Sequence, residues 1–243
     1  MENNRPLISI ITVVYNGVET IEQTIQSVIN QIYKNTEYII VDGGSNDGTV
    51  EIIKKYETRI TKWISEPDDG IYDAINKGIK LSKGAIVGIV NSDDWLDENA
   101  LSVVVQTSNV HQNVGVYHGL LAYWNKGVNV MIGGTDAAYL SSKMIEHPTC
   151  FVRKEVYEKV GLFNCAYLAA ADYDFMLRAK ECGIKFLLIP VVLSNFRIGG
   201  VTSSFASALE TLKVKKKHNC INNRSFLLTM LYLNTKRLFR FLQ

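Results

Sequence analysis

The sequence predicts an α/β fold in which a doubly wound sheet is flanked by helices. Two observations predict it: short β-branched runs alternate with segments of helical apolar spacing, and a polar loop follows each run. The chain of 243 residues, 47% of them hydrophobic and 21% charged, is long enough to bury the core of one large domain. We therefore expect one α/β domain followed by a tail.

Four apolar runs have the composition of strands that are buried on both faces of a sheet. They are the segments 7–15, 38–41, 60–64 and 85–90. Between them, apolar residues recur at helical spacing in the segments 21–32, 50–56 and 71–79. Because strands and helices alternate, the strands should run parallel and be joined by helical crossovers.

Ligands of such sheets bind beyond the carboxyl ends of the strands, where the strand order reverses. The loops at these ends should therefore carry the chemistry. They are the segments 15–17, 42–49, 66–70 and 91–94.

Two adjacent carboxylates, Asp93 and Asp94, follow the fourth predicted strand with no basic residue beside them. Two like charges this close repel, and a divalent cation can compensate them. Carboxylate oxygens suit Mg²⁺ or Mn²⁺, which usually bind one or two carboxylates together with the phosphates of a substrate. The alternative is a turn in which Asp94 or Asp97 caps a helix without any metal. The motif alone favours neither interpretation.

The glycine-rich loop 42–49 matches neither the dinucleotide fingerprint GxGxxG nor the phosphate loop GxxxxGK[ST]. Asp42 is therefore better placed to accept hydrogen bonds from a base or a ribose hydroxyl than to hold phosphate. The alternative is a turn-forming Asp42, with Asn46 or Asp47 capping the next helix.

Two further segments allow both a functional and a structural interpretation. Asn76 and Lys77 lie on a predicted helix from which they can reach a ribose or diphosphate, but such a pair is commonly a solvated helix face. The segment 197–204, with two glycines and three hydroxyl residues, is either a lid over donor phosphates or an ordinary connector.

The C-terminal segment 205–243 is strongly basic, whereas the rest of the chain is acidic. It carries one acidic residue, Glu210, and eight basic ones: Lys213, Lys215, Lys216, Lys217, Arg224, Lys236, Arg237 and Arg240. Apolar residues interleave with the basic ones from residue 226 onward, a composition typical of a helix on an anionic membrane surface. The alternative is packing on the domain or on a second subunit.

Cysteine usage and hydropathy indicate a cytoplasmic protein without a spanning helix. Cys150, Cys165, Cys182 and Cys220 form no CxxC pair, and the first five residues are polar, so we expect buried, reduced thiols. The apolar stretch 226–233 is far shorter than the roughly 20 residues that a membrane-spanning helix needs.

Six segments, in this order and spacing, together resemble the family 2 inverting glycosyltransferases. They are SIITVVYNG (9–17), VDGGSNDGT (41–49), EPDDGIYDAINKGI (66–79), GAIVGIVNSDDW (84–95), HPTCFVRKEVYEKVGLF (147–163) and AAADYDFMLRAKECG (169–183). The resemblance implies a GT-A type fold with one mixed sheet. It implies a single domain, 1–204, that is followed by the tail 205–243. The domain would consist of a nucleotide-binding half, 7–110, and an acceptor-binding half, 111–204.

The resemblance also implies roles for residues of the nucleotide-binding half. Tyr15 and Asp42 would line the nucleoside pocket, with Asp42 contacting the base. The acidic D-x-D element of the family falls on Asn91-Ser92-Asp93, which puts Asp93 at the metal-ligand position and Asp94 beside it. Asn91 replaces the first acid of that element, so one formal charge fewer lies near the ribose and the metal.

In the acceptor-binding half, Asp172 is similar to the general base of the family, although the Glu that commonly precedes it is Ala171 here. An acceptor hydroxyl must lose its proton as it attacks the sugar, so a carboxylate opposite the metal is required. Capping of the following helix is the alternative for Asp172. His147 resembles a histidine near the acceptor and diphosphate. Arg178 is a candidate for the same contacts or pairs with Asp174.

The predicted function is transfer of a sugar from a nucleotide-sugar, a UDP-sugar being favoured, to a glycan or lipid-linked glycan, with Mn²⁺ or Mg²⁺ as cofactor. The QxxRW motif of the processive members is missing, so we expect a non-processive enzyme. Expected partners are the inner face of the membrane or a second subunit through 205–243, and no nucleic acid. The alternatives are a nucleotidyltransferase or dehydrogenase on a related sheet, and a non-catalytic sugar-nucleotide binding protein.

Overall fold

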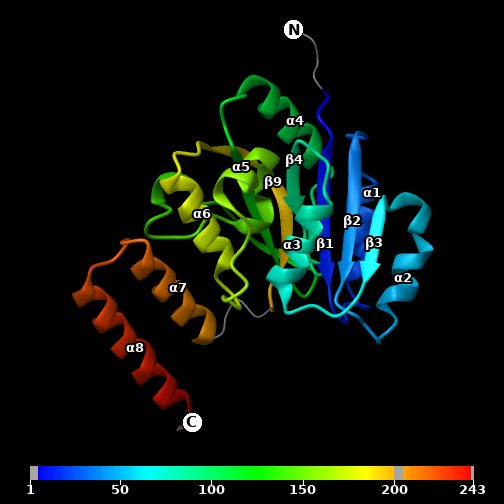
Figure 1. Cartoon of the computed structure of the whole chain (residues 1–243). Helices are drawn as coiled ribbons and strands as arrows, with labels where there is room; N and C mark the ends of the chain where they lie inside the picture. Colours follow the sequence, from blue (N-terminus) through cyan, green and yellow to red (C-terminus); the bar gives the residue numbers. More distant parts are fainter. Residues whose placement is uncertain (1–4, 200–204, 242–243) are drawn as a thin grey trace.

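The computed structural model describes residues 5–199 and 205–241, and its centre is one twisted mixed sheet with helices on both faces (Figure 1). The strands lie in the order β3-β2-β1-β4-β8-β6-β9-β5, with β7 paired to β6. This is the α/β class that the alternation of apolar patterns predicts.

The parallel half of the sheet contains the four predicted strands, β1 (Ile8–Val14), β2 (Thr36–Asp42), β3 (Lys62–Ser65) and β4 (Ile86–Ile89). They are connected by the predicted helices α1 (Ile21–Ile29), α2 (Thr49–Lys55) and α3 (Ile71–Leu81), with the 3₁₀ turn η1 (Glu57–Arg59) after α2. β1 has β2 on one side and β4 on the other, so the strand order reverses at β1 and β4.

The second half of the sheet makes it mixed. β8 (Phe151–Arg153) runs antiparallel to β4 and to β6 (Val116–Asn125), β6 runs parallel to β9 (Phe186–Arg197), and β9 pairs antiparallel with the short β5 (Trp95–Leu96). β7 (Val128–Gly133) forms a hairpin with β6, and the 3₁₀ turns η2 (Ala137–Tyr139) and η3 (His147–Thr149) precede β8.

Two apolar cores lie on opposite faces of the sheet, because side chains of a strand alternate between its faces. In β1, Ile11 and Val13 pack into the core under α3, α5 (Lys154–Val160) and α6 (Ala171–Glu181). Ile8 and Ile10 pack into the core under α1, α2 and α4 (Ala100–Val110). Burial on both sides is the physical reason for the uninterrupted apolar runs in the sequence.

The C-terminal segment forms two helices, α7 (Phe205–Lys217) and α8 (Asn223–Phe241), which lie side by side below α6 in Figure 1. Val214 of α7 is fully buried and belongs to the core under α6, so packing continues across the predicted boundary at residues 204 and 205. Within residues 5–199 and 205–241, no helix combines the length and the hydropathy of a membrane span.

The cysteines are free, as predicted, but their burial differs from the prediction. Cys150 is buried, whereas Cys165 and Cys182 are exposed and Cys220 is half-buried. Cys165 lies in the loop before α6 and Cys182 directly after that helix, where the chain returns to the surface.

Candidate functional site

The candidate site lies at the carboxyl ends of β1 and β4, where the strand order reverses. The loops that follow these two strands touch: a Cβ atom added at Gly17 would lie 3.3 Å from Oγ of Ser92. Thr24 of α1 also donates its hydroxyl to the backbone carbonyls of Ser92, at 2.9 Å, and Asp94, at 2.6 Å. The turn that carries the two acids is therefore held against α1.

Asp93 and Asp94 differ in their surroundings. Asp93 is partly exposed, whereas Asp94 is 1% exposed. From the described residues, Asp94 accepts long hydrogen bonds alone, from the Arg197 backbone N–H at 3.2 Å and the Asn91 amide at 3.4 Å. Burial, together with the charge of Asp93, raises the pKa of Asp94 to about 8. Within the described residues, no basic side chain forms an ion pair with either carboxylate.

This turn fits a divalent cation, because the described protein groups compensate its negative charge only in part. The charge of Arg197 lowers the pKa of Asp94, but burial and the charge of Asp93 outweigh that effect. No cluster of three or more His, Cys, Asp or Glu residues able to hold a metal ion occurs in residues 5–199 and 205–241. A cation here would therefore depend on one or two carboxylates and on the oxygens of a ligand, a common mode for Mg²⁺.

Arg197, at the end of β9, is the first residue of the predicted lid 197–204, and its contacts with this turn were not predicted from the sequence. Its guanidinium donates to the backbone carbonyl of Asp93 at 3.2 Å and to the Gln23 side chain at 2.7 Å, and it lies 5.3 Å from the centre of the Trp95 ring. The sequence separates it from Asp93 by 104 positions, so only the pairing of β9 with β5 brings the two together. The rest of the predicted lid, 200–204, lies outside the described residues.

Asp42, at the end of β2, is fully buried and organises the glycine-rich loop that follows it. One carboxylate oxygen accepts from the backbone N–H of Gly44 and Ser45, at 3.1 and 3.0 Å, and from the Ser65 hydroxyl at 2.6 Å. The other oxygen accepts from the Ser45 hydroxyl at 2.5 Å. In this structure Asp42 anchors the loop, and its contact with a base stays a prediction. Tyr15, by contrast, is 65% exposed.

Asp172 lies in the first turn of α6, one residue after the start of that helix. The residue in the capping position is Ala170, which has no side-chain cap, so the capping interpretation of Asp172 is wrong. Its Oδ1 atom accepts hydrogen bonds from the Tyr72 hydroxyl at 3.2 Å and from the Tyr173 backbone N–H at 2.8 Å. No hydrogen bond from the described residues reaches Oδ2, and the side chain is partly exposed.

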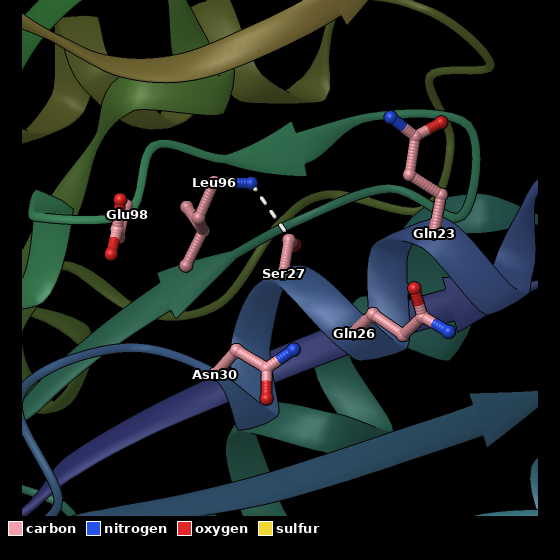
Figure 2. Close-up of a pocket in the computed structure, with 6 residues that line it drawn as sticks. All are labelled: Gln23, Gln26, Ser27, Asn30, Leu96 and Glu98. Carbon is pink, nitrogen blue, oxygen red and sulfur yellow. Dashed lines mark hydrogen bonds between the residues drawn. The ribbon is translucent and has the colours of Figure 1, made fainter.

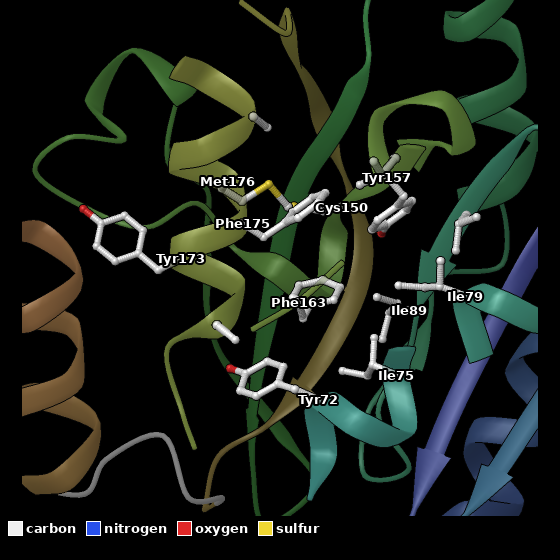
Figure 3. Close-up of a cluster of buried hydrophobic side chains, with 14 of the residues drawn as sticks. Tyr72, Ile75, Ile79, Ile89, Cys150, Tyr157, Phe163, Tyr173, Phe175 and Met176 are labelled. Atoms are coloured by element: carbon white, nitrogen blue, oxygen red, sulfur yellow. The ribbon is translucent and has the colours of Figure 1, made fainter. Parts of the chain in front are cut away.

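Tyr72, on α3, keeps its proton near Asp172, because burial and then the charge of Asp172 raise the pKa of the Tyr72 hydroxyl above its usual range. The α6 helix itself is fixed by a stack of aromatic rings in the core below it (Figure 3). Phe175 lies 5.0 Å from the ring centre of Tyr157 and 4.9 Å from that of Phe163, and Phe163 lies 5.8 Å from Tyr72. This packing connects the helix that carries Asp172 to α3 and α5.

His147 connects the two acidic regions. Gly88 of β4 pairs with Phe151 of β8 in antiparallel register, so the η3 turn, which starts at His147, lies beyond the carboxyl end of β4. Burial lowers the pKa of His147, and the nearby charge of Asp172 partly opposes this effect. The loop of Asp93, His147 and Asp172 are thus gathered at one edge of the sheet.

Two predicted contact residues have structural partners instead. The Asn76 amide donates to the Phe163 carbonyl at 2.9 Å and accepts from the Phe163 N–H at 3.0 Å, which fixes the loop before α6. Arg178 donates to Asp174 at 2.8 Å and to the carbonyls of Val160 and Leu162 at 2.6 and 2.7 Å. Both groups are buried or half-buried among these partners, so we correct their predicted ligand contacts to structural roles.

A separate groove of about 260 Å³ lies where α1 faces the segment of β5 and Glu98 (Figure 2). Gln23, Gln26, Ser27 and Asn30 of α1 line it together with Leu96 and Glu98. It contains a single carboxylate and none of the acids described above. Gln23 links it with the candidate site, because its side chain accepts from the Arg197 guanidinium.

Comparison with known proteins points to one family. The family model described as "Glycosyl transferase family 2" matches residues 9–161. An uncharacterized glycosyltransferase of Mycobacterium tuberculosis is 30% identical over 209 residues, which cover 82% of this chain and 78% of that protein.

Solved structures share the fold. The mannosyltransferase PcManGT from Pyrobaculum calidifontis, in complex with GDP-Man and Mn²⁺, superposes with a TM-score of 0.72 at 18% identity, over 95% of this chain and 70% of that one. TarS 1-349 of S. aureus, in complex with UDP-GlcNAc, superposes with a TM-score of 0.70 at 18% identity, over 85% of this chain and 64% of that one. The predicted fold class is confirmed.

Proposed function

The chain belongs to glycosyl transferase family 2 and is a transferase, and we propose that it is a non-processive inverting enzyme. In this proposal a sugar moves from a nucleotide-sugar, favoured to be a UDP-sugar, to a glycan or lipid-linked glycan. Asp172 is the general base. The carboxylate of Asp93, with Asp94 beside it, holds Mn²⁺ or Mg²⁺ against the donor diphosphate.

The observation that carries the proposal is the hydrogen bonding of Asp172. Its Oδ1 atom is held by Tyr72 and by the Tyr173 backbone, while no described residue bonds to Oδ2. A general base needs such a fixed carboxylate with one oxygen open to the acceptor hydroxyl. The Oδ2 atom would take the hydroxyl proton as the acceptor oxygen attacks the anomeric carbon, and a single displacement inverts that carbon.

The donor would lie across the ends of β1 and β4, with the nucleoside toward Tyr15 and the Asp42 loop. The open position of Tyr15 supports a stacking contact with a base, and Asn91 would face the ribose. His147 would contact the acceptor or diphosphate. When bound, the divalent ion supplies positive charge that stabilises the departing diphosphate.

The cation fits this chain because the buried Asp94 has no cationic side chain as an ion-pair partner among the described residues. The complex of PcManGT with GDP-Man and Mn²⁺ supports a divalent ion on the same fold. The UDP-GlcNAc complex of TarS supports a uridine donor, although GDP-sugars remain the alternative.

For the C-terminal helices we propose contact with an anionic membrane surface at the cytoplasmic face, where a lipid-linked acceptor would be presented. Four large side chains of α8 support this proposal: Leu227, Leu228, Leu231 and Tyr232 are 59–65% exposed on a helix that is rich in Lys and Arg. A second copy of the chain is the alternative occupant of this surface.

The proposal is tested with Asp172→Asn and Asp93→Ala. Binding of UDP is measured by calorimetry with and without Mn²⁺. Turnover is measured as the nucleoside diphosphate that is released from UDP-GlcNAc or GDP-mannose, with water or a free monosaccharide as the acceptor. Asp172→Asn should keep UDP binding and lose turnover by about 10²- to 10⁴-fold, because general bases contribute that much. Asp93→Ala should abolish the Mn²⁺ dependence of UDP binding.

Each expected result has a result that contradicts it. Unchanged turnover in Asp172→Asn removes that residue from the mechanism. UDP binding that ignores Mn²⁺ in the parent protein removes the metal site. Binding of a nucleotide-sugar without turnover by the parent protein favours a non-catalytic binding protein.

A further inference from the structure

The helix α7 packs around the segment that carries Asp172, although the two are more than 30 positions apart in the sequence. Val214 is fully buried in the core beside Tyr173, and the Lys215 ammonium donates to the Ser142 carbonyl at 2.5 Å. Lys217 lies 5.7 Å from the centre of the Tyr167 ring. Besides its packing on α8, helix α7 thus contacts α6, the loop before it and the segment that contains Ser142.

Glu210, the single acidic residue of the C-terminal segment, binds the backbone of that loop. Its carboxylate accepts from the Leu168 N–H at 2.9 and 3.0 Å and from the Ala169 N–H at 2.7 Å. Leu168 itself is 72% exposed, so its side chain does little to hold the loop in place. Hydrogen bonds from backbone amides to a charged acceptor are stronger than neutral ones, and those of Leu168 and Ala169 fix the chain four and three residues before Asp172.

A second contact holds α7 against α6 on the other side of Asp172. Asp174 is fully buried and accepts from Lys217 at 2.7 Å, from His218 at 3.0 Å and from Arg178 at 2.8 Å. Burial alone would raise the pKa of Asp174, but the hydrogen bonds from these three groups outweigh it and lower that pKa. The first turn of α6 is therefore bracketed by contacts with α7 at residues 168–169 and at Asp174.

The bracket lies at a helix start that has no side-chain cap. The capping residue of α6 is Ala170, and the Asp172 carboxylate accepts from one amide of the first turn, that of Tyr173. Glu210 supplies a carboxylate to two amides just before that start. Loss of this carboxylate would leave the loop free to move and, with it, the Oδ2 atom of Asp172.

We propose that Glu210 is a positioning residue for the reaction, which holds the loop 168–169 so that the Asp172 carboxylate meets the acceptor hydroxyl. The inference rests on the proposed role of Asp172 as general base. It gives α7 a role in positioning Asp172, whereas the sequence analysis assigns the segment 205–243 no role in the reaction. Glu210 touches no reacting atom and acts through Asp172.

The test compares Glu210→Gln and Glu210→Ala with Glu158→Gln, which removes an exposed carboxylate of α5 that has no hydrogen bond or ion pair among the described contacts. Turnover of UDP-GlcNAc or GDP-mannose should fall about tenfold in both Glu210 variants, because a displaced catalytic group costs up to about a hundredfold. UDP affinity and the thermal unfolding midpoint should stay close to the parent values. Glu158→Gln should behave as the parent protein.

A double variant separates positioning from general destabilisation. In the Asp172→Asn background, Glu210→Gln should cause no further loss of turnover, because its effect passes through Asp172. Equal turnover of Glu210→Gln and the parent protein, or full additive losses in the double variant, would overturn the inference. A wrong assignment of Asp172 as general base gives a different result, because the single variant Asp172→Asn then keeps the turnover of the parent protein.

Hydrogen exchange gives a readout that does not depend on the acceptor. The amides of Leu168 and Ala169 should exchange faster in Glu210→Gln, while those of β1 and β4 should be unchanged. Unchanged exchange at residues 168–169 would contradict the contact on which the inference depends.

Discussion

His118, on β6, is the described residue with the largest mismatch between its chemistry and its surroundings. The side chain is fully buried, and neither ring nitrogen has a hydrogen-bond partner among the described groups. Burial lowers the pKa of His118, although the charges of Asp136 and Glu146 partly oppose this effect. The imidazole is therefore neutral in the folded protein, and protonation costs more there than in the unfolded chain.

Replacement His118→Leu should raise the free energy of unfolding by about 1 kcal/mol at pH 8, because it removes unsatisfied buried polar atoms. The gain should be larger at pH 5. Below the usual pKa of about 6.5 the unfolded chain binds the proton more readily, so the stability of the parent protein falls as the pH falls. Urea unfolding at pH 5 and pH 8 measures both gains. An equal gain at the two pH values would show that the folded parent protein also binds this proton.

At the scale of elements, the position of Tyr72 depends on a close approach between α3 and β1. Gly78 of α3 faces Ile11 of β1, and a Cβ atom at Gly78 would lie 2.4 Å from Cγ2 of Ile11. Since Ile11 is fully buried in the sheet, its side chain has little room to move. The glycine therefore sets the distance of α3 from the sheet and the place from which Tyr72 reaches Asp172.

Overpacking in Gly78→Ala should cost about 1–3 kcal/mol, and the helix propensity of Ala offsets roughly 1 kcal/mol of it, so the net destabilisation should reach about 2 kcal/mol. Turnover should fall as well, because α3 would shift and move Tyr72. Denaturant unfolding and turnover are compared with Lys80→Ala, an exposed position of the same helix that should change stability by less than about 0.5 kcal/mol. A stabilised Gly78→Ala variant would contradict the close packing.

At the scale of the whole molecule, charge is unevenly distributed along the chain. The segment 205–243 has eight basic residues against one acidic residue, and Glu210 is used in the contact with the loop before Asp172. The two C-terminal helices therefore have different surroundings. Helix α7 packs on the domain, whereas α8 lies against α7 at the periphery of the molecule (Figure 1). Large apolar side chains of α8 are exposed.

The membrane proposal predicts that the full chain sediments with vesicles of phosphatidylglycerol and less with vesicles of phosphatidylcholine, and that salt weakens the binding. Leu227→Ser with Leu231→Ser should reduce binding at least about tenfold, since each apolar side chain contributes about 1.5–3 kcal/mol when fully buried. Val130→Ser with Ile132→Ser, on the exposed strand β7, is the matched control. Equal binding to both lipids, or dimerisation measured by light scattering, would contradict the proposal.

The sequence by itself determined the parallel half of the sheet, its helices and the edge at which Asp93 lies. This was readable because burial on two faces and helical periodicity are local patterns of apolar residues. Only the tertiary structure decided that Arg197 reaches the Asp93 loop from 104 positions away, that Asn76 and Arg178 bind backbone groups near α6, and that Glu210 holds the chain before Asp172. These contacts depend on how strands and helices that are distant in the sequence pack against one another. The local spacing of apolar and polar residues does not predict that packing.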